Sequence, residues 1–258
     1  MQRKELSFDT KTLPSSIKPF AEGARIYDSS CSETAQTLYL EGKFRTYLKI
    51  DKAGKLGREY AMTAFLHQYK LAPRILTYFM DKNHDYLLTL ALEGEDGISG
   101  PHLKNPKKLA RVFAESLRLI HALPQDKCPI QNRNTEMLQE ATANAKRDFG
   151  DLKLIPEGVA KAYEKLLSLK TYAIDDVVLH GDYCLPNIIM QNYNLQGFVD
   201  LGTGGVGDRH YDLFWSIWTL NYNLKTDKYK DIFLDAYGRS AIDFDRLELC
   251  RLLAGLTE

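Results

Sequence analysis

Residues 93–101, EGEDGISGP, separate two parts of the sequence that differ in character. The part before them, residues 1–91, alternates in the manner of strands and has one stretch of helical spacing at 55–70. The part over residues 92–258 is dominated by helical patterns and carries a few short apolar runs. Because strands and helices are segregated, we expect an α+β fold with two lobes. Residues 1–91 would form a small antiparallel β-rich lobe, and residues 92–258 would form a hinge and a larger, mostly helical lobe.

Individual elements follow from periodicity and from turn residues. A β-hairpin is expected over residues 74–92, where two apolar runs flank a polar turn. The segment NPKKLARVFAESLRLIHAL predicts a helix capped by Asn105, with Pro106 in its first turn. Further helices are expected over 133–149 and 157–170, and three more in the tail that begins with DRHYDLFWSIWTLNYNL.

Charge and cysteine content limit the class of protein. Lys+Arg and Asp+Glu both number 34, and this zero net charge argues against a general nucleic-acid-binding surface. The four cysteines are widely spaced, which favours reduced thiols over a disulfide framework or a zinc site. No apolar run reaches membrane-spanning length, and the first residues lack the apolar stretch of a signal peptide. We therefore expect a cytoplasmic protein with neither a nucleic-acid nor a membrane partner.

Polar residues that suit phosphoryl transfer cluster in the segment VVLHGDYCLPNIIM and beyond it. Asp182 follows an apolar run, Asn187 comes five residues later, and Asp200 ends the next apolar run. Transfer from ATP needs one carboxylate near the attacking hydroxyl, and an amide and a second carboxylate to hold Mg²⁺. The same gap of five residues separates Asp and Asn in the catalytic loop of protein kinases. Turn capping would explain each acid alone but not the whole set.

The glycines that follow Asp200 allow a second interpretation. Gly202, Gly204 and Gly207 match the spacing G-x-G-x-x-G of a dinucleotide-binding turn, and residues 198–201 read as the strand before it. Such a turn should follow the first strand of a βαβ unit, whereas this one lies near the C-terminus with no parallel strand expected after it. We expect the glycines to let the backbone turn closely beside Asp200 instead.

A kinase-type site also needs a clamp for the phosphates from the first lobe. Lys49 ends the apolar strand RTYLKI, and Glu59 lies in the helix that follows and could position Lys49. Tyr47 is two residues before Lys49, so it shares the same face of the strand and could cover an adenine ring.

These residues resemble a known family. LHGDYCLPNIIM followed by GFVDLGTGGVGDRHYDL is similar to the paired signature of aminoglycoside 3'-phosphotransferases, antibiotic kinases with a protein-kinase-like two-lobed fold. The resemblance covers nearly the whole chain, and its most specific part runs from Asp182 to Asp212. It implies ATP and Mg²⁺ as cofactors, and an aminoglycoside hydroxyl, the 3'-hydroxyl, as the phosphate acceptor.

The resemblance also implies a role for each matching residue. Asp182 would be the catalytic base, and Asn187 and Asp200 would bind Mg²⁺. Lys49, held by Glu59, would bind phosphate. The remaining implied positions are a phosphate loop that includes Ser30 and Ser32, an adenine-facing hinge from Thr89 to Leu92, and a structural acid at Asp212.

The acceptor side departs from the family pattern. Acids that would match a polycationic substrate are absent at Leu185 and Tyr222, and the C-terminal end is not acidic as it often is in the family. The acids that remain as candidates for acceptor contacts are Asp151, Glu157 and Glu258. Three alternatives therefore stay open: a kinase for another hydroxyl compound, a nucleotide-binding module without catalysis, and, more remotely, a dehydrogenase.

Overall fold

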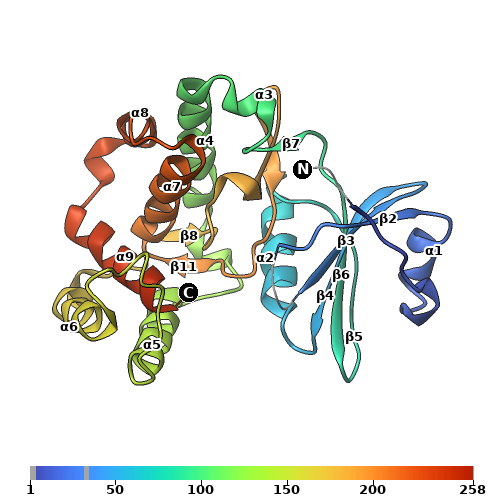
Figure 1. Cartoon of the computed structure of the whole chain (residues 1–258), viewed down its shortest axis with the longest axis horizontal. Helices are drawn as coiled ribbons and strands as arrows, with labels where there is room; N and C mark the ends of the chain where they lie inside the picture. Colours follow the sequence, from blue (N-terminus) through green and yellow to red (C-terminus); the bar gives the residue numbers. More distant parts are fainter. Residues whose placement is uncertain (1–3, 32–34, 258) are drawn as a thin grey trace.

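The computed structural model describes residues 4–31 and 35–257, and it has a β-rich lobe beside a mostly helical lobe (Figure 1). The first lobe is built on one antiparallel sheet with the strand order β1-β2-β3-β4-β6-β5. The predicted α+β fold is confirmed, including the hairpin expected over 74–92. The strands of this sheet are β1 (Lys4–Glu5), β2 (Arg25–Asp28), β3 (Gln36–Glu41), β4 (Arg45–Lys52), β5 (Ile75–Met80) and β6 (His84–Leu90).

One face of this sheet is covered by a short segment that the sequence patterns did not predict. It contains the 3₁₀ turn η1 (Thr10–Thr12) and the helix α1 (Lys18–Ala21). Its apolar side chains Leu13 and Ile17 pack on buried residues of the sheet such as Leu48. Four residues are too few to show a helical period, which is why the sequence gives no signal for α1.

The other face of the sheet carries α2 (Gly57–Gln68), which lies between the two lobes (Figure 1). Its residues Met62, Phe65 and Leu66 belong to the core of the helical lobe rather than to the core of the sheet. The predicted helix is therefore confirmed, and it ties the two lobes together. Tyr60 of this helix is exposed and stacks on Tyr78, with the ring centroids 4.6 Å apart.

Residues 93–101 connect the lobes, but they are more than a linker. They form β7 (Glu95–Asp96), which pairs with β9 (Ile188–Gln191) in a small sheet completed by β10 (Asn194–Phe198), and they lead into α3 (Gly100–Leu103). The strand could not be predicted from the glycine-rich composition, because glycine is unfavourable in strands. The same glycines allow the backbones to approach closely.

Helices make up most of the second lobe, as predicted. Asn105 caps the first long helix by accepting a hydrogen bond from the Lys108 N–H, as expected. The helix predicted over 133–149 ends at Ala145. None of the helices within the described ranges is long and apolar enough to span a membrane. The elements are α4 (Pro106–His121), α5 (Arg133–Ala145), α6 (Val159–Leu169), α7 (Arg209–Leu224), α8 (Lys230–Tyr237) and α9 (Phe244–Thr257), with the 3₁₀ turns η2 (Gln125–Lys127), η3 (Lys170–Tyr172), η4 (Leu185–Asn187) and η5 (Arg239–Ala241).

The glycine run after Asp200 begins with a turn at residues 202–203, as the second interpretation expects, and continues as a short strand that neither interpretation predicts. Residues Gly205–Gly207 form strand β11, which pairs antiparallel with β8 (Val177–Leu179). The strand expected at 198–201 is wrong, because β10 ends at Phe198 and Asp200 has a left-handed φ of 60° that a strand does not allow. All strand pairings of the described residues are antiparallel, so the βαβ unit of a dinucleotide-binding fold is excluded there.

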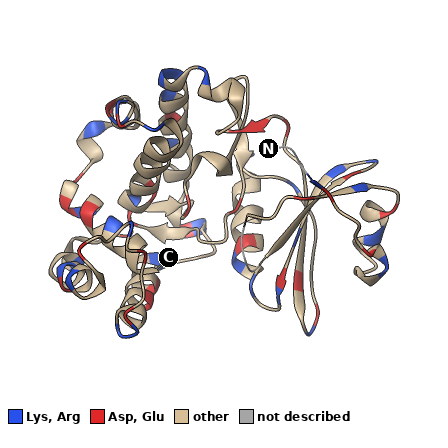
Figure 2. Cartoon of the chain, in the orientation of Figure 1, with Lys and Arg blue, Asp and Glu red and all other residues tan. Residues whose placement is uncertain are grey.

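Basic and acidic residues are interspersed along the chain in both lobes (Figure 2). This distribution agrees with the equal numbers of acidic and basic residues in the sequence.

Candidate active site

Lys49 connects the two lobes through two carboxylates. Its Nζ lies 2.7 Å from Oε2 of Glu59, in the first turn of α2, and 2.8 Å from Oδ1 of Asp200, after β10. Burial alone would lower the pKa of Lys49, but the attraction of Glu59 and Asp200 outweighs it, so the pKa is raised and the ammonium stays charged. Three residues singled out in the sequence therefore meet at one point.

Asp182 and Asn187 form the second part of the site. The Asn187 side-chain amide donates to Oδ2 of Asp182 at 2.8 Å and to its backbone oxygen at 3.0 Å. This orientation turns the amide oxygen of Asn187 away from Asp182 and leaves it for another ligand. The backbone links this pair to the first part, because the Val199 N–H donates to the backbone carbonyl oxygen of Asn187 at 3.0 Å and Val199 directly precedes Asp200.

The loop before Asp182 is held by a buried acid on another element. Asp212, in the first turn of α7, accepts hydrogen bonds from the backbone N–H groups of His180 and Gly181, both at 2.8 Å. His121, at the end of α4, lies 3.1 Å from the same carboxylate. The sequence suggested a structural role for Asp212, but it gave no sign of His121, since the contact spans 91 positions.

Gly181 is required by the shape of this loop. Its φ is +88°, and a Cβ atom built on it would lie 2.2 Å from the backbone oxygen of Thr203. The turn before Asp182 therefore packs directly on the segment after Asp200. In contrast, a Cβ on Gly202 would lie 3.6 Å from Oε2 of Glu59, at an ordinary contact distance.

His180 and Cys184 lie beside Asp182 without the properties of a base or a nucleophile. His180 is fully buried, and its Nδ1 accepts a hydrogen bond from the Asp182 N–H at 3.3 Å. Burial and the neighbouring Asp182 raise the pKa of the Cys184 thiol well above its ordinary value, so the thiolate is disfavoured. These contacts agree with an orienting role for His180 and a passive one for Cys184.

The residues predicted to bind the nucleotide lie in the sheet of the first lobe or directly after its last strand. Tyr47 and Lys49 are both half-buried on one face of β4, while Leu48 between them is buried on the other. Thr89 pairs with Tyr47 across the strands β4 and β6. Leu92 follows in the connection between the lobes, beside Gly197.

The predicted phosphate loop lies only partly in the described region. The Oγ of Ser30 accepts a hydrogen bond from the Thr37 N–H at 3.0 Å, which links β2 to β3 across the loop. Ser32 lies outside the described residues. A role in phosphate binding stays a prediction for both serines.

The acids predicted for the acceptor have contacts within the protein or lie outside the described residues. The Asp151 carboxylate accepts a hydrogen bond from the Lys153 N–H at 2.8 Å, as in a tight turn. Glu157 forms an ion pair with Arg251, with a distance of 2.5 Å between Oε1 and Nη2. Glu258 lies outside the described part of the chain. Their role in acceptor binding stays a prediction.

The interpretation of Leu185 as a missing cleft acid is wrong. Its side chain is fully buried in the core of the helical lobe, where a carboxylate would have no solvent contact. Tyr222, by contrast, is 58% exposed. Of these two positions, only Tyr222 has a side chain at the solvent-exposed surface, where a ligand can reach it.

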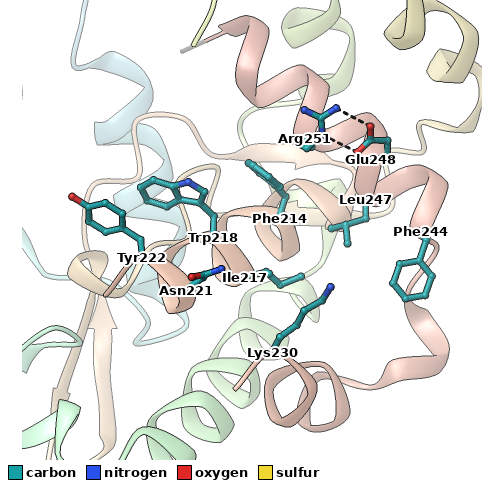
Figure 3. Close-up of a pocket in the computed structure, with 10 residues that line it drawn as sticks. All are labelled: Phe214, Ile217, Trp218, Asn221, Tyr222, Lys230, Phe244, Leu247, Glu248 and Arg251. Atoms are coloured by element: carbon teal, nitrogen blue, oxygen red, sulfur yellow. Dashed lines mark hydrogen bonds and ion pairs between the residues drawn. The ribbon is translucent and has the colours of Figure 1, made fainter. Parts of the chain in front are cut away.

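A groove between α7, α8 and α9 was not anticipated from the sequence (Figure 3). It has a volume of 580 Å³ and is lined by the aromatic residues Phe214, Trp218, Tyr222 and Phe244. Phe214, Trp218 and Tyr222 recur every four residues on α7, and this spacing was an available signal of one aromatic helix face. The groove itself depends on how α9 packs against α7, which the spacing does not reveal.

The lobes, the lysine bridge and the Asp182 loop together define a kinase-like phosphotransferase. Residues 33–250 match the phosphotransferase enzyme family, and the chain belongs to this family. It is 41% identical over 250 residues to a probable aminoglycoside 3'-phosphotransferase of Lactococcus lactis subsp. lactis, with 95% of each chain covered. It is also 34% identical over 183 residues to an aminoglycoside 3'-phosphotransferase of Niallia circulans, with 68% of each chain covered. The chain is therefore a phosphotransferase enzyme, as the sequence motifs predicted.

Solved structures share the fold. An aminoglycoside phosphotransferase of Streptomyces rimosus superposes with a TM-score of 0.74 at 23% identity, covering 92% of this chain and 93% of that one. An aminoglycoside-3'-phosphotransferase of type VIII superposes with a TM-score of 0.74 at 20% identity, covering 93% of this chain and 98% of that one. The kinase-like two-lobed architecture predicted from the motifs is thus confirmed.

Proposed function

We propose that this enzyme transfers the γ-phosphoryl group of ATP to a hydroxyl group of a small molecule. The observation that carries the proposal is a continuous set of contacts from Glu59 through Lys49 to Asp200, and from there through the backbone of Val199 and Asn187 to Asp182. This set joins groups from both lobes, between which a nucleotide and an acceptor can be aligned.

Each group has a chemical role in this proposal. The Asp182 carboxylate accepts a hydrogen bond from the acceptor hydroxyl and takes its proton as the new P–O bond forms, while the bond from the γ-phosphorus to the bridging oxygen breaks and ADP leaves. Lys49 faces the phosphates and stabilises their charge, and Glu59 holds it in place. Tyr47 and the Thr89–Leu92 connection lie beside the adenine.

Mg²⁺ is part of the same proposal, because the donor set suits it. Asn187 offers an amide oxygen and Asp200 a half-exposed carboxylate, and Mg²⁺ favours a few such oxygen donors together with phosphates. Bound there, the ion would neutralise charge on the phosphate oxygens. Lys49 already neutralises Asp200 in the described structure, so the carboxylate is not left as an uncompensated charge before the nucleotide binds.

The first candidate for the acceptor is an aminoglycoside, phosphorylated at its 3'-hydroxyl. It is supported by the names of the Lactococcus and Niallia relatives, which cover most of this chain. The relatives in solved complexes include one with ADP and streptomycin, which supports a nucleotide and a small-molecule acceptor for this fold. A cytoplasmic location belongs to the proposal, since ATP is the donor.

The second candidate is a less charged hydroxyl compound, such as a sugar or an alcohol. It is favoured by the aromatic groove of the helical lobe and by Tyr222, an exposed aromatic residue where the family pattern leads us to expect an acid.

A panel of acceptors tests the proposal directly. The enzyme is incubated with Mg²⁺ and ATP labelled at the γ-phosphate, together with kanamycin, neomycin, simple sugars or alcohols, and labelled products are separated. We expect transfer to at least one class, which would also exclude a binding module without catalysis. If the enzyme bound ATP but neither hydrolysed it nor transferred label to any compound of the panel, the proposal would be contradicted.

A further inference from the structure

Glu136 on α5 pairs with two arginines that come from different elements. Its Oε2 lies 2.8 Å from Nη2 of Arg58, in the first turn of α2, and 2.6 Å from Nη1 of Arg133, one turn earlier on α5. Burial raises the pKa of Glu136, but the hydrogen bonds from Arg133 and Arg58 outweigh it, so the pKa lies below its ordinary value. A charged carboxylate therefore joins α2 to the helical lobe.

Arg133 extends these contacts to the segment that follows Asp200. Its Nε donates a hydrogen bond to the backbone oxygen of Thr203 at 3.0 Å. Its side-chain stem packs on the next residues, because a Cβ atom built on Gly205 would lie 2.6 Å from Cγ of Arg133. Arg133 is buried, so packing has already removed much of its rotamer freedom, and its hydrogen bonds cost little further side-chain entropy.

The arginine–carboxylate cluster closes a ring with the lysine bridge. Arg58 directly precedes Glu59 in α2. Thr203 lies three residues after Asp200. Glu59 and Asp200 are the two carboxylates that hold Lys49, so the cluster contacts the chain next to both of them. The groups of the ring, in order, are Lys49, Glu59, Arg58, Glu136, Arg133, Thr203 and Asp200.

Apolar contacts between α2 and the helical lobe accompany the ring. Met62 lies one turn after Arg58 on α2, and a Cβ atom built on Gly204 would lie 2.9 Å from its Cε. The Sγ of Cys128 lies 3.7 Å from the Sδ of Met62. Methionine packing is adaptable, so these contacts hold α2 close without fixing one orientation. Hydrogen bonds to a carboxylate are directional, so Glu136 can fix the orientation.

We propose that Glu136 is a positioning residue, which through Arg58 and Arg133 fixes α2 relative to the turn at residues 202–203. The separation of Glu59 and Asp200 across Lys49 is then fixed as well. The inference rests on the proposed function for its consequence, which is that Lys49 and Asp200 are in place before Mg·ATP binds. Without Glu136 the two carboxylates would shift relative to each other, and ordering them would reduce the affinity for the nucleotide.

The affinity for Mg·ATP, measured by calorimetry, tests this consequence. Glu136→Gln and Arg58→Met each remove the partly exposed ion pair, and each should weaken binding by about fivefold, the size expected for such a pair. Arg58→Lys keeps the charge and should restore the affinity to within about twofold of wild type. Glu140→Gln changes an exposed acid one turn further along α5 and should also stay within about twofold.

Hydrogen exchange tests the position of the two elements without any nucleotide. Mass spectrometry compares amide exchange in residues 57–60 of α2 and in residues 201–207. Glu136→Gln should speed exchange in both segments by about fivefold, because the carboxylate that joins them is lost. Arg58→Met should speed it only in residues 57–60, since Arg133 still holds Thr203. Glu140→Gln should change neither segment.

Two results would overturn the inference. One is a lower free energy of unfolding for Glu136→Gln with unchanged affinity for Mg·ATP, which is what a merely structural ion pair would give. The other is unchanged exchange of residues 201–207 in Glu136→Gln. Failure of the wild-type protein to bind Mg·ATP, with exchange responding as expected, would instead refute the proposed function and would support the coupling of α2 to the turn.

Discussion

The ammonium of Lys49 lies 2.8 Å from the carboxylate of Asp200, although the two residues are 151 positions apart in the chain. Lys49 belongs to the sheet of the first lobe, and Asp200 belongs to the second lobe. The same ammonium is held by Glu59 on α2, whose apolar face is part of the core of the second lobe. The relative position of the lobes and the position of the lysine are therefore coupled.

Removing the charge of Lys49 should mainly weaken the use of ATP by the enzyme. Lys49→Met is expected to lower kcat/KM for ATP by about a hundredfold or more, because a charge-assisted contact to phosphate is lost. Glu59→Gln keeps an oxygen acceptor and should lower it by about tenfold. Steady-state kinetics with ATP as the varied substrate would measure both effects.

Lys52 supplies the matched control for this change. It is exposed at the end of the same strand, and Lys52→Met should leave kcat/KM for ATP within about twofold of wild type. If Lys49→Met behaved like Lys52→Met, the ammonium would have no part in nucleotide binding.

The residues of this site could be found from the sequence because each lies next to a strong local signal. Lys49 ends an apolar strand, Glu59 follows in a clear helix, and Asp182 and Asn187 have the spacing of a known loop. What the sequence could not supply is their contacts with partners far along the chain. The hydrogen bonds of Asp212 to the Asp182 loop and the contact of His121 to Asp212 depend on packing of α4 and α7.

A Cβ atom at position 181 should destabilise the whole protein. Gly181→Ala places a methyl group against the Thr203 backbone and requires a left-handed φ, so the free energy of unfolding should fall by about 2–4 kcal/mol. Gly202→Ala has ordinary contact distances and should change it by less than about 1 kcal/mol. Urea denaturation of both variants would measure this difference, and equal losses would show that the two loops are not packed as described.

The pH dependence of stability should reveal the ion pairs at the rim of the groove. Hydrogen bonds from Arg251, reinforced by Lys165 and opposed by burial, lower the pKa of Glu248 to about 2 from its ordinary value of 4.5. Because the folded pKa is the lower one, folding favours the ionised form. The contribution to stability is therefore complete above about pH 5 and is lost as the pH falls from 4.5 toward 2.

Glu248→Gln tests this dependence by comparison with wild type. The difference in unfolding free energy between the two proteins should be constant from about pH 7 to pH 5 and should shrink below pH 4.5. The exposed Glu140→Gln provides a control without an ion pair among the described residues. A difference that stayed the same down to pH 3 would refute the assignment.

The parts of the structure that the sequence did not predict share a physical cause. Strands β7 and β11 consist of few residues beside glycines, and their pairing partners β9 and β8 lie far away in the chain. The groove is similar, since Phe214, Trp218 and Tyr222 were visible as a repeat on one helix but Phe244 comes from α9. A strand pairing or a groove that is built from several distant segments cannot be predicted from any single stretch of sequence.

The central claim is that Asp182 accepts the proton of the attacking hydroxyl while other residues bind the nucleotide. The most direct test compares Asp182→Asn with wild type in two measurements, the affinity for Mg·ATP by calorimetry and kcat of phosphoryl transfer to the best acceptor of the panel. Asparagine keeps the size of the side chain and an oxygen that the Asn187 amide can reach, so nucleotide affinity should stay within about twofold. We predict that kcat falls by about a hundredfold or more, because a general base is lost. A variant that retains more than about a tenth of the wild-type kcat, at unchanged nucleotide affinity, would contradict the account.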